Sequence, residues 1–595
     1  MSGFKDILKD RFGMFVHYGI YSEMAGEYKG EECTHLGEWI QHSLKIPNEE
    51  YAQFGKKHFL PSPDFAKNLV KSAKDAGIRY IVLTSKHHDG FCLFKSDYTD
   101  YSSYEYFGRD ICRELADECK KEGLGLGLYY SHTLDWHEKD AGGNFHSAAW
   151  IPVKNRNDWD FPDENFNFEK YLYEKCFPQV RELLTNYGDL KLIWFDYPHN
   201  ITKEQSRKLR ALVKELQPNC QINSRIAHDC NDYVSLGDNA LPTAPTGVDL
   251  ECLITLNDTW GYKKQDNNWK TSEDVIGVLS RTLGSDSTLL LNVGPMGDGT
   301  LTDETLQILK KTGEWTRRNS EAIYGNVQGN PFSCTFEWGC VSTKEKCLYI
   351  YVKDKTQKNL YINVGKNNIV KSVSLIGDVL KPEYTLSEGL LTVNPIETDF
   401  EIPVYKIEFE NEPVFDKSLS QIADTLNLDV LWANKVTKGN ESDEAAPLVY
   451  EKSEFSSDYG KHGLAVSKDC NTAFWTDCSE VLCWDAYFKE AGEYEATLTH
   501  YLAYIFAQNH SYLYEEPREA KAEFSLSVAG QTNDVDMQSE KLRYATSKTS
   551  KFNTYIRRNA GKFTIEKAGK YRILLFKKEG FDDLPITRVT FTINR

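Results

Sequence analysis

One carboxylate stands at the end of an apolar and aromatic run, Leu190-Lys191-Leu192-Ile193-Trp194-Phe195-Asp196-Tyr197. Such a run predicts a buried strand, and in barrels of parallel strands and helices the chemistry lies at the carboxyl ends of the strands. Asp196 has the alternative role of capping the next helix. However, Thr202-Lys203-Glu204-Gln205 has the form of a capping box and already serves that helix. We therefore interpret Asp196 as a functional carboxylate.

Other polar and aromatic groups stand where further predicted strands end. They are His17, His87, His88, Tyr129, Tyr130, His132, Trp194, Arg225 and Glu251, with Glu38 and Trp39 in the first long loop. The carboxyl ends of barrel strands meet at one face, so we expect these groups to converge. Histidines, rings and carboxylates without a cofactor motif suit a glycosidase, in which two carboxylates act on the bond and the other groups bind the sugar.

A metal-dependent hydrolase is the main alternative for these residues. His87, His88 and Asp89, together with His132 and His137, are residue types that bind zinc. Adjacent histidines on an extended chain point to opposite sides, and no H-E-x-x-H pattern occurs, so we expect no metal. Dinucleotide fingerprints and phosphate loops are also missing from the sequence, and no cofactor is expected.

The elements that must position these groups alternate between strand-like and helix-like over residues 1–330. Strand-like segments lie at 12–18, 80–86, 124–131, 190–197, 221–225, 250–256 and 288–293, with helices between them, one of them kinked near Pro178. This alternation implies a parallel sheet, and seven or eight units favour a closed (β/α)8-like TIM barrel, an α/β fold.

After about Pro331 the sequence changes to short β-forming segments. They predict a small antiparallel β-sandwich over 331–412 and a C-terminal β-sandwich over 413–595. A carbohydrate-binding module is one interpretation of the second sandwich. The cluster of Trp475, Trp484 and Tyr487 within it is nevertheless more typical of a core than of a sugar-binding surface.

Composition limits the partners. The chain has 595 residues and a net charge of −18, which argues against nucleic acid because phosphate binding needs clustered Lys and Arg. Its 14 cysteines are scattered singly, which suits a reducing compartment. No signal-peptide core and no run of membrane-spanning length is present. We expect a cytoplasmic protein, or an exported one whose signal is missing from this sequence, with no membrane partner.

Seven motifs, in order, resemble the α-L-fucosidases of glycoside hydrolase family 29 over roughly residues 1–330. They are Arg11-Phe12-Gly13-Met14-Phe15-Val16-His17-Tyr18-Gly19, His87-His88-Asp89-Gly90-Phe91, Tyr129-Tyr130-Ser131, Trp194-Phe195-Asp196, Asn223-Ser224-Arg225, Trp260-Gly261-Tyr262 and Leu289-Leu290-Leu291-Asn292-Val293-Gly294-Pro295. The histidine pair with Asp-Gly-Phe and the Leu-Asn-Val-Gly-Pro run are the most specific.

This resemblance implies a retaining enzyme that releases terminal α-L-fucose from fucosylated oligosaccharides and glycoconjugates through a covalent fucosyl–enzyme intermediate. Asp196 then matches the family's nucleophile. Positions that bind fucose in the family are matched by His17, Glu38, Trp39, His87, His88, Tyr130, Trp194 and Arg225. Trp260 matches an aromatic position suited to the C5 methyl group of the sugar.

The acid/base residue has two candidates. Retention needs a second carboxyl roughly 5 Å from the first, protonated before the bond breaks. Glu251 lies in an apolar stretch that would raise its pKa, and it matches a Trp-Glu position of many members, although Leu250 replaces the Trp. Other members use a glutamate in the loop after the arginine, where this chain has Asp238. We predict that Glu251 is the acid/base residue, with Asp238 as the alternative. If Glu251 has only a structural role, that role is an internal salt bridge in the barrel.

Two other functions remain open at this point. A catalytically weak, lectin-like barrel would keep the fucose pocket without turnover, and a related glycosidase would act on another sugar of similar shape. The presence of Asp196 together with a second candidate carboxylate favours activity.

Overall fold

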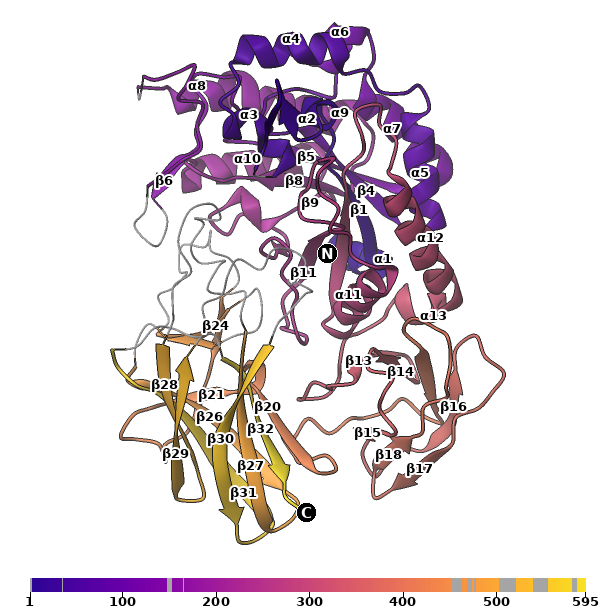
Figure 1. The fold of residues 1–595 in the computed structure, drawn as a ribbon, viewed down its shortest axis with the longest axis vertical. Coiled ribbons are helices and arrows are strands. Elements are labelled where there is room, and N and C mark those ends of the chain that lie inside the picture. The colour runs from indigo at the N-terminus through magenta and orange to yellow at the C-terminus, as the bar shows by residue number, and fades with distance from the viewer. Residues whose placement is uncertain are drawn as a thin grey trace.

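The computed structural model describes residues 3–34, 36–146, 152–163, 165–451, 463–467, 473–475, 478–501, 521–538, 555–580 and 586–595. Figure 1 shows a body of helices and strands built from the first half of the chain, with two separate groups of strands beyond one end of it. No helix among these residues is long and apolar enough to cross a membrane.

The first body is built around one sheet of eight parallel strands in the order β10-β11-β12-β1-β4-β5-β8-β9. Their bounds are β1 Phe12–Val16, β4 Tyr80–Lys86, β5 Gly125–Ser131, β8 Leu192–Asp196, β9 Gln221–Ile222, β10 Val234–Ser235, β11 Leu250–Thr255 and β12 Ser287–Val293. The Ser235 N–H donates to Ser224 Oγ at 3.1 Å, which links the two outer edges of the sheet. The predicted α/β barrel is therefore confirmed. The two-residue strand β10 is not among the strand-like segments of the sequence, because it is too short to show a periodicity.

Helices connect the strands and cover the outside of the sheet (Figure 1). The longer ones are α4 Asn48–His58, α5 Phe65–Asp75, α7 Ile111–Glu122, α9 Phe177–Asn186, α10 Lys203–Leu216, α11 Ser272–Gly284 and α12 Asp303–Arg318. The shorter ones are α1 Gly3–Asp10, α2 Ile20–Met24, η1 Gly37–Trp39, α3 Ile40–Ser43, α6 Ser103–Phe107, α8 Phe168–Tyr171, η3 Ser224–Ile226 and α13 Ser320–Ile323. Two further antiparallel strand pairs lie outside the main sheet, β2 Glu27–Tyr28 with β3 Glu31–Glu32 and β6 Asn144–His146 with β7 Pro152–Lys154.

Thr202 begins helix α10 as the sequence predicts. Its hydroxyl accepts the Gln205 N–H at 3.3 Å, while Gln205 Oε1 accepts the Thr202 N–H at 2.9 Å. This reciprocal pair satisfies the first free N–H groups of the helix, so Asp196 is not needed as a cap.

Alternation along the strands divides the side chains between two layers. Inside the barrel, Phe15, Tyr129 and Trp194 belong to one buried cluster that also contains Leu253 and Leu290. The alternate residues, such as Val16 and Tyr130, pack outward in the larger cluster with the helices. Because successive side chains of a strand point to opposite faces, this pattern determines which member of each strand-end pair reaches the barrel interior.

Two antiparallel β-structures follow. In the smaller one, β13 Gly339–Lys344, β14 Cys347–Val352, β19 Val404–Phe409 and β16 Val370–Leu375 form one sheet, and β15 Leu360–Asn363, β18 Leu390–Val393 and β17 Tyr384–Ser387 form the other. They enclose a separate apolar core that includes Leu348, Ile350 and Ile407.

The C-terminal structure has two larger sheets around a core that includes Trp484, Phe524 and Phe591. One sheet holds β23 Val449–Glu451, β24 Leu464–Ser467, β25 Ala473–Trp475, β32 Ile586–Ile593, β27 Gly492–Tyr501, β30 Tyr555–Ile565 and β20 Thr425–Asp429. The other holds β22 Ala446–Pro447, β21 Asn434–Thr437, β26 Glu480–Phe488, β31 Gly569–Lys577, β28 Lys521–Val528 and β29 Gln531–Gln538, and η4 Val430–Trp432 lies between β20 and β21. The barrel and β-sandwich architecture is as predicted, while the boundaries at 330 and 412 stay predictions.

Candidate active site

Asp196 ends β8 inside a ring of hydrogen-bond donors. Its Oδ1 accepts from Arg225 Nη1 at 3.0 Å and from the Tyr197 N–H at 2.9 Å. Its Oδ2 accepts from the Tyr129 hydroxyl at 2.9 Å, and His88 Nε2 lies 3.8 Å away. The side chain keeps 15% of its surface exposed, so the carboxylate is held rigidly but remains accessible.

These contacts keep Asp196 ionised. Burial would raise its pKa, but the charge of Arg225, the neighbouring His88 and the hydrogen bonds from Arg225 and Tyr129 together lower that pKa below its ordinary value. A buried, ionised carboxylate of this kind has the properties of a nucleophile.

The histidines beside Asp196 are neutral. Burial lowers the pKa of His17 to about 3 and that of His88 to about 4, and it also lowers the pKa of His87 well below its ordinary value. His17 Nδ1 lies 2.7 Å from Asn292 Oδ1, and His88 Nδ1 lies 2.7 Å from Ser131 Oγ. Each of these two rings is thereby oriented through one nitrogen, which leaves the other nitrogen to meet a ligand.

Aromatic contacts join these histidines to the other predicted residues. The ring of His17 lies 5.5 Å from that of His87 and 5.2 Å from that of Trp260, and the rings of His88 and Trp39 are 5.2 Å apart. Trp194 completes the set, because the Arg225 guanidinium lies 4.9 Å above its ring. The predicted convergence at one face is therefore present for this group.

Glu38 connects the first loop to the loop that carries Trp260. Its Oε2 accepts the Gly261 N–H at 2.8 Å and the Thr259 hydroxyl at 3.2 Å. Burial raises the pKa of Glu38 to about 7, against the hydrogen bonds that lower it. The carboxyl of Glu38 thus holds the Trp260 loop in place.

The prediction chose the wrong member of the Tyr129–Tyr130 pair. Tyr130 points out of the barrel, where its hydroxyl donates to Gln179 Oε1 of helix α9 at 2.7 Å. Tyr129 points inward and reaches Asp196, in register with Trp194 on the neighbouring strand. A strand cannot turn two successive side chains to the same face, so only one of them can line the pocket.

We expect Tyr129→Phe and Tyr130→Phe to have different effects. Loss of the Tyr129 hydrogen bond should raise the pKa of Asp196, and therefore move the acidic limb of the kcat/KM profile to higher pH, with activity roughly tenfold lower. Tyr130→Phe also removes one hydroxyl group, but it should leave the acidic limb unchanged because that hydroxyl bonds to Gln179 and not to Asp196. The protein itself should become less stable. Steady-state kinetics against pH for both variants provides the test, and equal shifts of the acidic limb would contradict it.

The two acid/base candidates occupy different environments. Glu251 is fully buried, with Oε1 accepting from Trp194 Nε1 at 2.7 Å and from the Tyr233 hydroxyl at 3.3 Å. Burial raises its pKa to about 7, as the apolar sequence predicts. Asp238 keeps 39% of its side chain exposed, and its carboxylate binds Nη2 of the same guanidinium that binds Asp196. Of the two carboxylates, Asp238 is the accessible one.

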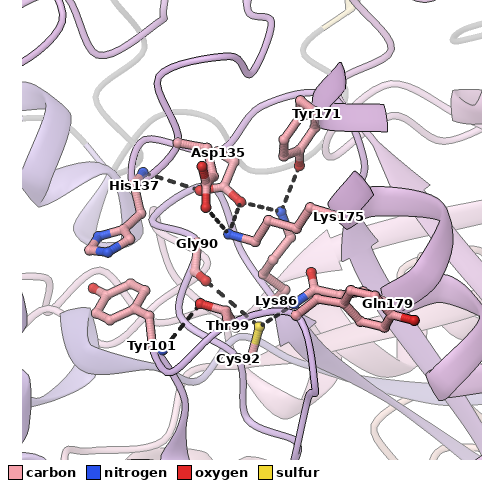
Figure 2. Close-up of polar contacts among 12 residues, drawn as sticks. Lys86, Gly90, Cys92, Thr99, Tyr101, Asp135, His137, Tyr171, Lys175 and Gln179 are labelled. Atoms are coloured by element: carbon pink, nitrogen blue, oxygen red, sulfur yellow. Dashed lines mark hydrogen bonds and ion pairs between the residues drawn. The ribbon is translucent and has the colours of Figure 1, made fainter. Parts of the chain in front are cut away.

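A buried ion network stands behind the histidine pair, and Figure 2 shows its contacts. Lys86, the last residue of β4, donates to Asp135 Oδ2 and to the Tyr171 hydroxyl, both at 2.9 Å. Lys175 donates to the same Asp135 oxygen at 3.1 Å. Lys175 belongs to a π-helical turn, η2 Leu172–Cys176, which lies at the predicted irregularity before Pro178.

This network fastens the strand end that carries His87 and His88 to the loop after β5. The Trp136 N–H, next to Asp135, donates to the His88 carbonyl at 2.7 Å. Gly90 has a φ of +77°, and a Cβ there would collide with Asp135. The glycine of the His-His-Asp-Gly-Phe motif is therefore required by this close approach.

The residues proposed as metal ligands in the alternative hypothesis have other partners. Asp89 accepts from the Tyr51 hydroxyl at 3.0 Å, and His137 stacks on Tyr101 with ring centroids 3.9 Å apart. Within the described ranges, no group of three or more His, Cys, Asp or Glu side chains is placed to hold a metal ion.

Three comparisons relate the chain to known proteins. A family model described as Alpha-L-fucosidase matches residues 4–321. The chain is 25% identical to an alpha-L-fucosidase of Dictyostelium discoideum over 423 residues, 63% of this chain and 87% of that protein. It is 26% identical to the plasma alpha-L-fucosidase of Homo sapiens over 390 residues, 60% of this chain and 77% of that protein.

Solved structures give the same relationship. The structure of an alpha-L-fucosidase from Vibrio sp. strain EJY3 is 25% identical and aligns with a TM-score of 0.79 over 99% of this chain and 98% of that one. An alpha-L-fucosidase from Lactobacillus casei, in complex with its alpha-L-fucose product, is 38% identical, with a TM-score of 0.51 over 54% of this chain and 100% of that one.

Proposed function

The chain belongs to the alpha-L-fucosidase family and is thus a glycosidase that releases fucose, and we propose that it does so with retention of configuration. Its substrates are then fucosylated oligosaccharides and glycoconjugates with terminal α-linked L-fucose. The observation that carries the proposal is the pair of carboxylates, Asp196 and Asp238, on one Arg225 guanidinium.

In the proposed first step, the ionised Asp196 attacks the anomeric carbon of fucose and forms a covalent fucosyl–enzyme ester. The bond to the aglycone oxygen breaks, and that oxygen takes a proton from the acid/base residue. In the second step the same residue removes a proton from water, and the oxygen of this water displaces Asp196. Two inversions release α-L-fucose. Tyr129 and Arg225 support the proposal because their hydrogen bonds stabilise the carboxylate when it leaves.

We assign the acid/base role to Asp238 in preference to Glu251. Retaining enzymes place the two carboxyls roughly 5 Å apart. Asp196 and Asp238 are held close to each other because both bind the guanidinium of Arg225. Glu251 has no exposed surface and faces Trp194 Nε1, so its proton has no open path to a glycosidic oxygen. In this proposal Glu251 holds the indole ring of Trp194 in place, and that ring in turn supports Arg225.

Fucose recognition is proposed to use His17, Glu38, Trp39, His87, His88, Trp194, Arg225 and Trp260, with Tyr129 in place of Tyr130. Neutral imidazoles and carboxyls exchange hydrogen bonds with hydroxyl groups without the cost of burying an unpaired charge. The ring of Trp260, packed on His17 and 6.1 Å from Phe15, offers an apolar surface for the methyl group at C5. A sugar with a hydroxyl at C6 would leave that group unpaired here.

The experiment that tests this function follows the first product by proton NMR during hydrolysis of 4-nitrophenyl α-L-fucopyranoside by the full chain. We expect the α-anomer of fucose to appear first and the β-anomer only as mutarotation proceeds. Initial release of β-L-fucose would overturn the retaining mechanism. Binding of the fucoside without release of nitrophenol would instead favour a lectin-like barrel.

A further inference from the structure

A large cavity lies where four parts of the chain meet, and Asp196 is not among the residues that line it. Its volume is about 1460 Å³, and its walls come from Thr246 of the barrel, from the small β-sandwich, from the segment 414–420 and from the C-terminal β-sandwich. Trp432, Asn434, Tyr487 and Lys489 of the C-terminal part of the chain are among the residues that line it. None of the residues proposed to bind fucose lines it. We call this cavity the junction groove.

Tyr487 lines the junction groove and is not part of a hydrophobic core. It lies near the end of β26, where its N–H donates to the Leu419 carbonyl at 2.8 Å and its carbonyl accepts from Gln421 at 3.0 Å. Its backbone is thus fixed, yet 45% of the residue is exposed. Trp484, three residues earlier, is fully buried and donates from Nε1 to the Asp429 carbonyl at 3.0 Å. The sequence cluster therefore divides, with Trp484 in the core and Tyr487 on the surface.

Trp432 is a second ring with an unused polar group. It ends the short turn η4, which buried Val430 anchors in the C-terminal sandwich. Within the part of the chain that the structure describes, neither the Trp432 indole N–H nor the Tyr487 hydroxyl forms a hydrogen bond, and neither ring packs on another ring. An accessible ring face with a free donor beside it is a surface that binds an amphipathic ligand.

Several of the charges that line the junction groove are paired within the protein. Asp485 accepts two hydrogen bonds from Arg572, both at 2.9 Å, and Lys366 forms an ion pair with Glu388. Burial lowers the pKa of Lys489, against the nearby Asp416. A surface of aromatic rings, amides such as Asn434 and paired charges suits a neutral polar ligand that also has apolar faces. A cavity of about 1460 Å³ exceeds the range of roughly 300–1,000 Å³ that is usual for small ligands, so it has room for several sugar rings.

We propose that the junction groove binds a neutral oligosaccharide, at a site separate from the fucose pocket. Sugar rings stack on Trp432 and Tyr487, and the indole N–H and phenol hydroxyl bond to their hydroxyl groups. A glycan held there stays near the barrel after one fucose has left, which raises the effective concentration of its remaining branches.

The first test uses a ligand without fucose, so that the result does not depend on the proposed fucosidase mechanism. The full chain is titrated with lacto-N-tetraose, a neutral tetrasaccharide, up to about 10 mM, and binding is measured by saturation-transfer NMR and calorimetry. We expect Trp432→Ala and Tyr487→Ala each to weaken binding by roughly three- to tenfold. Tyr384→Ala is the matched control, because Tyr384 is 38% exposed on β17 and does not line the groove.

The second test is kinetic. Both groove variants should hydrolyse 4-nitrophenyl α-L-fucopyranoside like the wild type, while KM for a multiply fucosylated oligosaccharide rises and kcat stays constant. An unchanged aryl fucoside rate shows that the barrel of each variant is folded, and an unchanged thermal melting curve shows the same for the C-terminal β-sandwich. Absence of lacto-N-tetraose binding, binding that Trp432→Ala and Tyr487→Ala leave intact, or stronger binding of a sulfated than of a neutral oligosaccharide would each overturn the proposal.

Discussion

Replacement of Asp196 by asparagine is expected to lower kcat/KM for 4-nitrophenyl α-L-fucopyranoside by roughly 10⁴- to 10⁶-fold. The amide keeps the shape of the side chain and the hydrogen bond from Tyr129, but it cannot form the fucosyl ester. Arg225 retains Asp238 as a partner, so the melting temperature should change little. Even an aryl leaving group cannot rescue the reaction, because the attacking group itself is missing.

The matched control is Asp117→Asn, an exposed aspartate of helix α7 on the outside of the barrel, which should retain full activity. Asp196→Gly with added azide gives a further readout. A small external nucleophile in the vacated space should produce β-L-fucosyl azide, with inverted configuration. Asp196 is not the nucleophile if Asp196→Asn keeps substantial turnover, or if the glycine variant yields the α-azide.

Replacement of Asp238 by asparagine is expected to have the second largest effect, and one that depends on the leaving group. Hydrolysis of fucosylated oligosaccharides should fall by roughly 10²- to 10⁴-fold, because a sugar oxygen must be protonated as it leaves. A dinitrophenyl α-L-fucoside, whose leaving group departs without a proton, should lose much less in its first step. Azide should then restore turnover by intercepting the fucosyl–enzyme, and the product should be α-L-fucosyl azide.

Glu251→Gln is the matched comparison for this prediction. Glutamine can still accept from Trp194 Nε1, so we expect a modest loss of activity in the same proportion for sugar and aryl leaving groups. Parallel kinetics on the two substrates measures the difference between the variants. If the dependence on leaving group appears in Glu251→Gln and not in Asp238→Asn, Glu251 is the acid/base residue that the sequence favoured.

Much of the fold follows from local pattern. Apolar runs such as Leu192–Asp196 and Ser287–Val293 are long enough to indicate buried strands, and the Thr202 capping box marks the start of α10. The strand predicted over 221–225 is present as the shorter β9. The two-residue strand β10 has no such signal, because its hydrogen bonds depend on neighbours far away in the chain.

Part of the candidate site could also be predicted. Asp196, the histidine pair and Arg225 follow the ends of predicted strands, and a parallel barrel brings those ends together whatever the details of packing. Asn292 and Ser131, which orient His17 and His88, lie inside motifs that the sequence singled out, but no pattern assigns them that role. Their role depends on the distances between their side chains and the histidine rings in the folded structure.

The sequence by itself determined the barrel, its strand ends and the residue types at its mouth, because those depend on periodicity and local hydrogen bonding. Only the tertiary structure decided between Tyr129 and Tyr130, placed Glu251 beneath Trp194 and put Asp238 on the guanidinium that binds Asp196. Strand phase, burial and the sharing of one cation by two carboxylates are set by contacts between segments far apart in the chain, and such contacts leave no periodic signal in the sequence.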